Sequence, residues 1–545
     1  MYKYRFGYLA GYLFFIFSKH MKQWIAFSLV VLLFIACKIK PKNDTPAIEE
    51  PPVSSLSGKE LALTYCSSCH AFVNPELLPA SSWKLSVLPA MGYRMGIYNR
   101  GSRPDSLFDA GISGEVVRNA NIFPEKPVLA KEDWHKIEEY FIKNSPDTIL
   151  PPVRKTPIRI GLKHFRYKET LFSHRPALTT MVKILPDNKG IAYADGKPGR
   201  SILTFLNPDL RENFSLPLRS TPVQFREKSN ELFLTIAGNG IFPTDAFDGS
   251  LQRLVKKDTG MGFQSGDMLI PNLKRPVCIA FEDLNKDGLE DAVICEFGNQ
   301  TGELAWFQQN QNGGYTKNLL NSKPGAITAI IKDANKDGLP DIYVLMAQAD
   351  EGVFLYENLG AGRFKEKRLL SFPPLYGSQY IELADFNKDG FDDIVYVCGD
   401  NADKTPILKN YHGIYIFLND GKNNFRQSYF YQMNGAYKAM VNDYDLDGDP
   451  DIAAISFFPD YRNYATESFI YLENKGHLKF DDYSFPEATK GRWIVMDAGD
   501  MDADGDTDLV LGSFVYFIAD GDTTGLGKQW LTTGPSVIVL ENTIR

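Results

Sequence analysis

Two cysteines and a histidine near the N-terminal end carry the clearest chemical pattern. Cys66 and Cys69 lie one helical turn apart, and His70 follows Cys69 directly. This is the attachment pattern of a c-type haem, in which two thiols bond the vinyl groups and the adjacent imidazole ligates the iron. Half of a zinc site would need further ligands close by, whereas the next cysteine is Cys278. A thioredoxin-like redox pair would not require His70. The sequence therefore predicts one covalently bound haem c.

The second axial ligand of this haem is expected from the segment that follows. Met91 comes shortly after Pro89 and directly before Gly92, which lets the chain approach the ring, so Met91 is the preferred ligand. Met95 is the alternative. A thioether ligand raises the reduction potential relative to a second imidazole. His135 is expected to be a surface residue on a helix instead.

Helical periodicity flanks this predicted site. The segments 61–66 and 131–143 carry apolar stripes, which predict two terminal helices that cross over the haem edge. A run of prolines after residue 145 marks a linker. Residues 58–148 are therefore predicted to form a small all-α haem domain, which resembles a small cytochrome c, and residues 149–162 a linker.

Farther along the chain, five short segments share one acidic template. Each places oxygen-bearing side chains at positions 1, 3, 5 and 9 and a glycine at position 6, and successive segments start 50 to 58 residues apart. Such oxygens, completed by the backbone carbonyl of position 7, are what a calcium-sized cation requires. The alternative is a set of turns held only by aspartate hydrogen bonds. The predicted ligands are Asp283, Asn285, Asp287, Asp291, Asp333, Asn335, Asp337, Asp341, Asp385, Asn387, Asp389, Asp393, Asp443, Asp445, Asp447, Asp451, Asp500, Asp502, Asp504 and Asp508.

These segments are not EF-hands, which need a glutamate at position 12 and a helix on each side. Position 12 is apolar in all five and lies in a run that predicts a strand covered on both faces. A period near fifty residues indicates one repeated unit, as in a propeller or solenoid. Segments 183–190 and 223–238 look like two repeats whose acidic loop has decayed. Seven repeats predict an all-β propeller of seven four-stranded blades over residues 163–545.

Residues 163–545 resemble the FG-GAP or VCBS family of calcium-bearing propeller repeats, similar to those of integrin heads. The resemblance implies the fold and the metal, while members of the family serve in adhesion, ligand binding and scaffolding. The integrin signatures Phe-Gly and Gly-Ala-Pro are not clearly present, so integrin-like ligand binding is not implied. The 17 carboxylates of the five loops repel one another unless a cation is present. Up to five Ca²⁺ ions are therefore expected to stabilise the propeller, with Kd values of about 0.1 to 1 mM.

The N-terminal segment has the pattern of a targeting signal. A basic residue and the apolar run 25–33 follow Met21, and a small residue stands before Cys37. This ending resembles a bacterial lipoprotein signal, which implies cleavage before Cys37 and lipidation of its thiol; the alternative is an uncleaved signal anchor. Residues 1–36 are therefore predicted to be an upstream extension and signal peptide, and residues 37–57 a tether. The mature protein is expected in the bacterial envelope, lipid-anchored to the outer membrane and facing the periplasm or the cell surface.

The connections on the face opposite the acidic loops are the expected interaction surface. Aromatic residues in 457–464, together with Tyr516, would receive a glycan, a protein partner or the haem domain, or would pack against neighbouring blades. Cys278 and Cys295 lie symmetrically about the first acidic loop, so they are expected either to form a disulfide or to remain buried thiols. Cys398 is expected to be a buried thiol.

Composition and motifs together indicate an electron carrier. The 545-residue chain has 67 acidic and 59 basic side chains, and its formal charge of -8 argues against a nucleic acid partner. No nucleophile elbow, phosphate loop or zincin motif is present, so no catalytic residue is predicted. The leading hypothesis is electron transfer between a redox protein donor and acceptor, with the propeller as a docking scaffold. The alternatives are a surface protein that binds a glycan or protein with an accessory haem, and a dehydrogenase that passes electrons to its haem.

Overall fold

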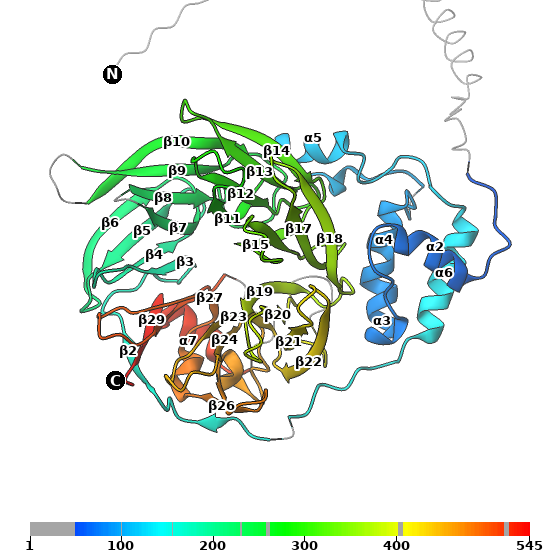
Figure 1. Ribbon diagram of the computed structural model, residues 1–545. Coiled ribbons are helices and arrows are strands. Elements are labelled where there is room, and N and C mark those ends of the chain that lie inside the picture. Colours follow the sequence, from blue (N-terminus) through cyan, green and yellow to red (C-terminus); the bar gives the residue numbers. More distant parts are fainter. Residues whose placement is uncertain are drawn as a thin grey trace, which may run out of the picture. The chain divides into compact units, whose positions relative to one another are not determined.

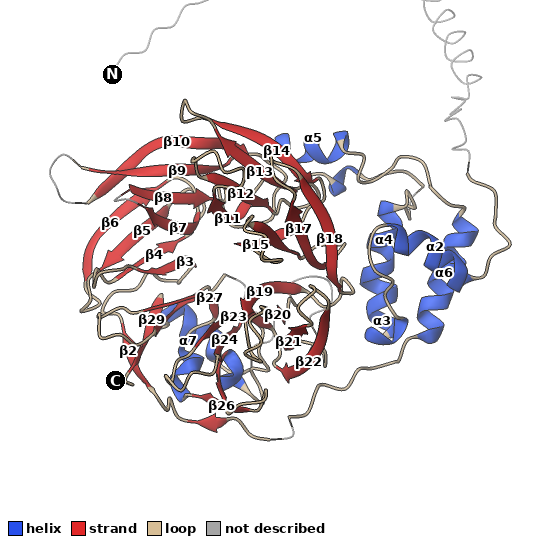
Figure 2. Ribbon diagram, in the orientation of Figure 1, coloured by secondary structure: helices blue, strands red, loops and turns tan. Residues whose placement is uncertain are grey.

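The computed structural model describes residues 50–544 apart from 100, 155, 229–230, 258–261, 402–406 and 517–522. The predicted signal, Cys37 and most of the predicted tether lie outside the described residues. Among the described residues, helices dominate before residue 150 and strands dominate after it (Figure 1 and Figure 2). None of the described helices is long and apolar enough to cross a membrane.

The first part of the described chain, residues 58–144, is called the helical segment. Its α-helices are α2 (Gly58–Tyr65), α3 (Ala80–Ser82), α4 (Leu88–Arg94), α5 (Ile112–Asn119) and α6 (Lys131–Asn144). Helix α2 starts after Ser57 because the Ser57 hydroxyl accepts the N–H of Glu60 and the Glu60 carboxylate accepts the N–H of Ser57. Helices α2 and α6 lie where two terminal helices were predicted. They approach so closely that a Cβ on Gly58 would lie 2.1 Å from the Lys136 carbonyl oxygen, so only glycine fits at this crossing.

Strands that follow form seven sheets around one axis, which confirms the predicted seven-bladed β-propeller (Figure 1). The first two blades, from the inner strand outwards, are β3 (Thr179–Ile184), β4 (Ile191–Asp195), β5 (Ser201–Leu206) and β6 (Glu212–Leu218), then β7 (Pro222–Lys228), β8 (Glu231–Ile236), β9 (Gly249–Lys256) and β10 (Phe263–Leu273). The next two are β11 (Pro276–Glu282), β12 (Asp291–Glu296), β13 (Glu303–Gln309) and β14 (Tyr315–Asn321), then β15 (Ala326–Lys332), β16 (Asp341–Met346), β17 (Gly352–Asn358) and β18 (Phe364–Ser371).

The fifth and sixth blades are β19 (Ser378–Ala384), β20 (Asp393–Cys398), β21 (Gly413–Asn419) and β22 (Phe425–Gln432), then β23 (Ala436–Asn442), β24 (Asp451–Ser456), β25 (Phe469–Asn474) and β26 (Phe480–Ser484). The seventh contains β27 (Trp493–Gly499), β28 (Asp508–Ser513), β29 (Val537–Asn542) and β2 (Phe165–Glu169). Helix α7 (Leu526–Thr532) lies in the connection between β28 and β29.

Strand β2 closes the ring, because it comes from the start of the propeller and completes the last blade. It pairs antiparallel with β29, and Phe165 lies opposite Asn542. Strand β1 (Arg159–Ile160) pairs in parallel with β26 and adds a fifth strand to the sixth blade. Residues 159–160 were predicted as linker, but Arg159 forms an ion pair with Asp481 at 3.0 Å, which attaches them to that edge.

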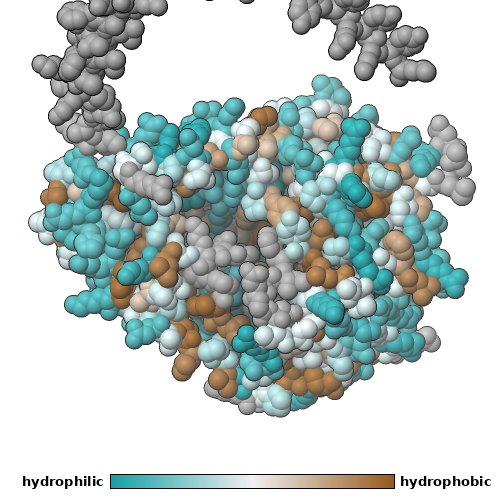
Figure 3. All heavy atoms as spheres, turned by 180° about the vertical axis from the view of Figure 1, so that it is seen from behind, coloured by the Kyte–Doolittle hydropathy of each residue, from teal (hydrophilic) through white to brown (hydrophobic). Residues whose placement is uncertain are grey.

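The hydrophobic core lies between neighbouring blades. The second strand of each of the last five blades is buried along its whole length, as predicted for strands covered on both faces. One cluster joins Val293 of β12 to Val344 of β16 and Phe354 of β17, which belong to adjacent blades. Viewed from behind, hydrophilic residues cover most of the described surface and hydrophobic residues form separate groups (Figure 3).

Candidate metal centres

The predicted haem-attachment residues lie together at the end of α2. Cys66 follows the last residue of the helix and Cys69 follows one short 3₁₀ turn later; both thiols are free. The Nδ1 atom of His70 lies 2.8 Å from the carbonyl oxygen of Ala71. A carbonyl only accepts, so Nδ1 carries the proton and Nε2 keeps the lone pair that an iron ligand needs. Burial raises the pKa of Cys66 to about 11.

The two predicted thioether ligands also lie close to this site. Met91 lies in α4 and Met95 follows its last residue. Both pack, together with Cys66, against the buried core of the helical segment, which includes Trp134. The side chain of His135 is 67% exposed and faces glutamates of its own helix, as expected for a surface residue. The donor types fit a haem c: Cys66, Met91 and Met95 pack against one core, and Cys69 and His70 follow Cys66 in the chain. The choice between the two methionines stays open.

The five acidic loops each join the first strand of a blade to the second. In every loop the aspartate at position 1 accepts the N–H of the glycine at position 6, at 2.7 to 3.1 Å. Position 4 has positive φ in all five, and so does the glycine at position 6, for which a side chain would be unfavourable. The backbone therefore turns the side chains of positions 1, 3 and 5 towards one another.

The aspartate at position 9 has a second role that its place in the template did not predict. It is fully buried in each loop, and one carboxylate oxygen accepts the N–H of loop position 2. The other oxygen accepts a backbone N–H at the end of the third strand, at 2.7 to 2.8 Å. The Oδ2 of Asp451 also accepts the hydroxyl of Tyr471 at 2.7 Å. At least one oxygen of each of these aspartates still keeps a second lone pair, so the residue can still face a cation. Burial raises the pKa of Asp451 to about 7 and that of Asp393 to about 6.

The asparagine that ends the third strand is a structural residue whose role the sequence did not reveal. An asparagine recurs at this place in all five acidic repeats, and this recurrence is the sequence signal that was available. The amide of Asn358 donates to the carbonyl of Pro340 in its own loop at 3.0 Å and to that of Leu284 in the preceding blade at 2.8 Å. The amide of Asn542 likewise donates to the carbonyl of Tyr444 in the preceding blade at 2.8 Å. These amides tie neighbouring acidic loops together.

The last two loops bring the most carboxylates together. In each, three aspartates have oxygens within 4.8 Å of one another: Asp443, Asp445 and Asp451, and Asp500, Asp502 and Asp504. One oxygen of Asp443 and one of Asp502 are buried without a hydrogen-bond partner among the described residues. Such oxygens gain a ligand if a cation binds, so these two loops fit calcium best.

Two residues beside the fourth acidic loop were not predicted. His164 and Glu473 have ligand atoms within 4.8 Å of Asp445. Lys163 pairs with Glu473, and the Nζ of Lys475 lies 2.7 Å from the same carboxylate. Because two lysines already balance its charge, we assign Glu473 no metal.

Most aromatic residues of the predicted interaction surface pack inside the propeller. Phe457 is 9% exposed, and the guanidinium of Arg492 lies 3.8 Å from its ring centroid. The hydroxyl of Tyr461 donates to the Phe457 carbonyl at 2.8 Å. Tyr516 is 48% exposed and contacts the ring of Phe242. The alternative of packing against neighbouring blades therefore describes this group better than an open binding site.

The propeller cysteines have free thiols in the structure. Cys278 and Cys295 lie directly opposite each other on β11 and β12, as their symmetry about the loop predicts. Cys398 is buried, as expected.

A separate group of charged side chains lies on the inner strands, which contact one another around the axis. Lys183 pairs with Asp497 at 2.9 Å, and Lys438 donates to the carbonyl of Met496. Burial raises the pKa of Glu382 to about 7, although the charge of Lys438 opposes the shift. One Glu382 oxygen is buried without a hydrogen-bond partner among the described residues. Sequence periodicity could not identify this group because its members come from four blades.

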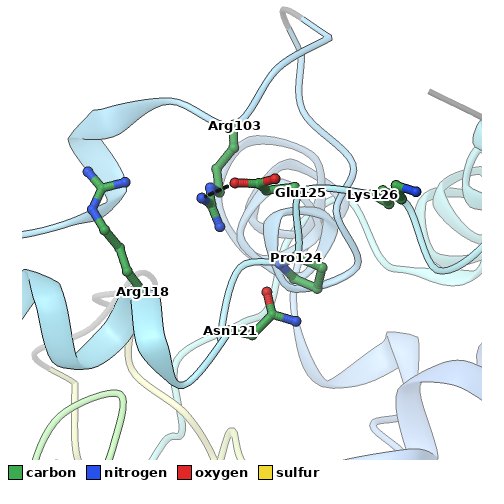
Figure 4. Close-up of a pocket in the computed structure, with 6 residues that line it drawn as sticks. All are labelled: Arg103, Arg118, Asn121, Pro124, Glu125 and Lys126. Carbon is green, nitrogen blue, oxygen red and sulfur yellow. Dashed lines mark hydrogen bonds and ion pairs between the residues drawn. The ribbon is translucent and has the colours of Figure 1, made fainter. Parts of the chain in front are cut away.

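The helical segment contains a pocket of about 410 Å³, away from the cysteines, which Figure 4 shows. Both arginines that line it already have carboxylate partners: Arg103 pairs with Glu125 at 2.6 Å, and Arg118 pairs with Asp105 at 3.0 Å. We therefore assign it no anionic ligand.

Comparison with known families identifies the repeats. The FG-GAP-like repeat family matches residues 283–344, 333–396 and 443–511, and all five acidic loops lie within these matches. No curated protein matches the sequence. Solved structures that match this chain include that of Saccharomyces cerevisiae Sqt1, at 9% identity over 69% of this chain and 99% of that one, with a TM-score of 0.41. Another is the periplasmic gluconolactonase PpgL of Pseudomonas aeruginosa, at 11% identity over 57% and 85%, with a TM-score of 0.37. The protein therefore carries FG-GAP-like repeats within a seven-bladed β-propeller.

Proposed function

We propose that the protein is a c-type cytochrome that transfers electrons, and that its propeller is a calcium-stabilised docking scaffold. The donor set at the end of α2 carries the proposal: two free thiols one turn apart, and an imidazole whose Nε2 keeps its lone pair because Nδ1 donates to Ala71. A haem bound there would supply reversible one-electron transfer.

Each residue of the site has a separate task in this proposal. Cys66 and Cys69 would hold the haem covalently, and the Nε2 of His70 would ligate the iron. The sulfur of Met91 would be the second ligand, with Met95 as the alternative, and both side chains pack against the same buried core as Cys66. A second redox protein would be donor or acceptor. A lipid on Cys37 would hold the protein at the outer membrane of a bacterial envelope.

The acidic loops would bind up to five Ca²⁺ ions. Support comes from their shared turn, the converging aspartates and the unpartnered oxygens of Asp443 and Asp502 among the described residues. The ions would remove the repulsion between these carboxylates and hold neighbouring blades in register.

The test is a reduced-minus-oxidised visible spectrum of protein produced with a haem-attachment system, followed by a redox titration. We expect one haem per chain and loss of covalent haem in Cys66→Ala/Cys69→Ala. Met91→Ala and Met95→Ala identify the second ligand, because only removal of the true ligand sulfur lowers the midpoint potential strongly. A colourless wild-type protein that folds normally would refute the proposal.

A further inference from the structure

One carboxylate of the fifth acidic loop lies outside the calcium template. Asp506 stands at loop position 7, where the template uses only the backbone carbonyl. Asp506 is 2% exposed, and both of its carboxylate oxygens are buried without a hydrogen-bond partner among the described residues. Burying an ionised carboxylate without compensation is strongly unfavourable, so this group requires a positive charge beside it.

Asp506 belongs to the contact between the fourth acidic loop, in the sixth blade, and the fifth, in the seventh blade. We call this contact the last seam. The amide of Asn442, at the end of β23, donates to the hydroxyl of Thr507, the residue after Asp506, at 3.0 Å. The amide of Asn542 in turn donates to the carbonyl of Tyr444 in the fourth loop at 2.8 Å. The loop that carries Asp506 is therefore fixed to the sixth blade.

At the two preceding seams, position 7 of one loop faces position 4 of the loop before it, and position 4 is a lysine. The Nζ of Lys336 lies 3.8 Å from the ring centroid of Phe391. The Nζ of Lys388 lies 2.6 Å from the Oδ1 of Asp449, the aspartate at position 7 of the fourth loop. The seam before the last one thus compensates its position 7 carboxylate with a cation that belongs to the chain.

The last seam has the carboxylate without the lysine. Position 4 of the fourth loop is Leu446, which is 53% exposed. The N–H of Asp506 donates to the Oδ1 of Asp504 at 3.3 Å, so a second carboxylate lies close by. Carboxylate oxygens that lie together without a fixed cation are suited to a hard metal ion.

The charges of the fourth and fifth loops lead to the same conclusion. Each loop contains five aspartates in nine residues. In the fourth loop, Lys388 pairs with Asp449, and the Nζ of Lys475 lies 3.9 Å from the Oδ2 of Asp445. In the described part of the chain, no such ion pair involves the fifth loop. One divalent ion in its template would therefore leave three negative charges uncompensated.

We propose that Asp506 binds a further divalent cation of calcium size at the last seam, separate from the ions proposed for the five templates. This ion takes the place that Lys388 fills at the preceding seam, and it holds the seventh blade to the sixth. The inference rests neither on the proposed haem nor on an ion in the template of the fifth loop.

The first arm of the test compares urea unfolding of the full-length protein in chelator and in 10 mM calcium. A cation site with a Kd of about 0.1 to 1 mM lowers the equilibrium constant of unfolding ~10- to 100-fold at this concentration. We expect the calcium effect to be smaller by this factor in Asp506→Asn than in wild type. Asp449→Asn is the matched control and should keep the full effect, because its carboxylate already pairs with a lysine. Equal calcium effects in Asp506→Asn and wild type would overturn the inference.

The second arm supplies the missing lysine. In chelator, Leu446→Lys should lower the equilibrium constant of unfolding about twofold to fivefold relative to Leu446→Gln, which carries no charge. In an Asp506→Asn background, the two variants should be equally stable. Equal stability of the two variants when Asp506 is present would overturn its placement at this seam.

The third arm separates the seam ion from the template ion. In an Asp502→Ala background, which lacks a template ligand, Asp506→Asn should still reduce the calcium effect ~10- to 100-fold. No further reduction would assign Asp506 to the template ion and overturn the separate site. If Asp502→Ala alone keeps the wild-type calcium effect, the ion proposed for this template fails, and the first arm still decides the seam site.

Discussion

Glu382 should make the stability of the propeller depend on pH. Its pKa is raised from 4.5 to about 7 because burial disfavours the charged form. A carboxyl whose pKa is raised in the folded state stabilises that state fully when the pH is below the pKa of the unfolded chain. This stabilisation is lost as the pH rises through the pKa of the folded state. One unit of pKa difference corresponds to about 1.4 kcal/mol, so the free energy of unfolding should decrease by ~3 kcal/mol in total, with ~2.5 kcal/mol of the decrease between pH 5 and pH 8.

The variant Glu382→Gln removes the ionisation and keeps the shape of the side chain. We expect the free energy of unfolding of the variant, relative to wild type, to rise by ~2.5 kcal/mol from pH 5 to pH 8. Urea denaturation followed by tryptophan fluorescence, with saturating calcium throughout, measures this difference. Asp209→Asn, in the exposed turn between β5 and β6, should show no such trend. A difference between Glu382→Gln and wild type that stays constant over this range would refute the buried ionisation.

Three further predictions concern the acidic loops. Chelation of calcium should lower the melting temperature, because each site with a Kd of about 0.1 to 1 mM contributes ~0.6 to 2 kcal/mol at 2 mM calcium; an unchanged melting temperature in calorimetry would argue against the metal. In the presence of chelator, Asp393→Ala should still lower the free energy of unfolding by ~2 to 5 kcal/mol, because it leaves the buried N–H groups of Phe386 and Asn419 without an acceptor. The control Asp389→Ala, at an exposed carboxylate, should cost less than ~1 kcal/mol. Equal losses of the two variants in urea titrations would contradict the structural role of position 9. Asn358→Ala should cost ~1 to 3 kcal/mol through its two lost bonds, and Asn310→Ala, whose side chain bonds only to Thr316, serves as the control that should lose clearly less.

Much of the propeller could be predicted because the last five repeats share one local sequence pattern, an acidic loop followed by an apolar run. The spacing of the acidic loops gave the period, and the apolar runs after them marked strands that neighbouring blades cover on both sides. Even the two repeats that lack the acidic template could be found; in the first of them, Ile184 and Ile191 still end and begin paired strands around a short turn.

Other features depend on residues far apart in the chain, so no local pattern could show them. The pairing of β2 with β29 joins segments that share no motif. The buried state of Asp245 follows from contacts with Ser113 and Thr301, which lie in different parts of the fold. The second role of the position 9 aspartates depends on a backbone N–H at the end of the third strand, which comes close only in the folded blade. Their spacing in the sequence therefore suggested only a metal ligand.

The pairing of Phe165 with Asn542 also sets when the ring can be completed. The ribosome makes Asn542 about 380 residues after Phe165, a delay of roughly 20 to 75 s at usual rates of synthesis. During this interval β2 has no partner strand, and its exposed edge is open to pairing with another chain. The ring of blades therefore cannot close until β29 has been synthesised, and loss of β29 would leave β2 without a partner strand.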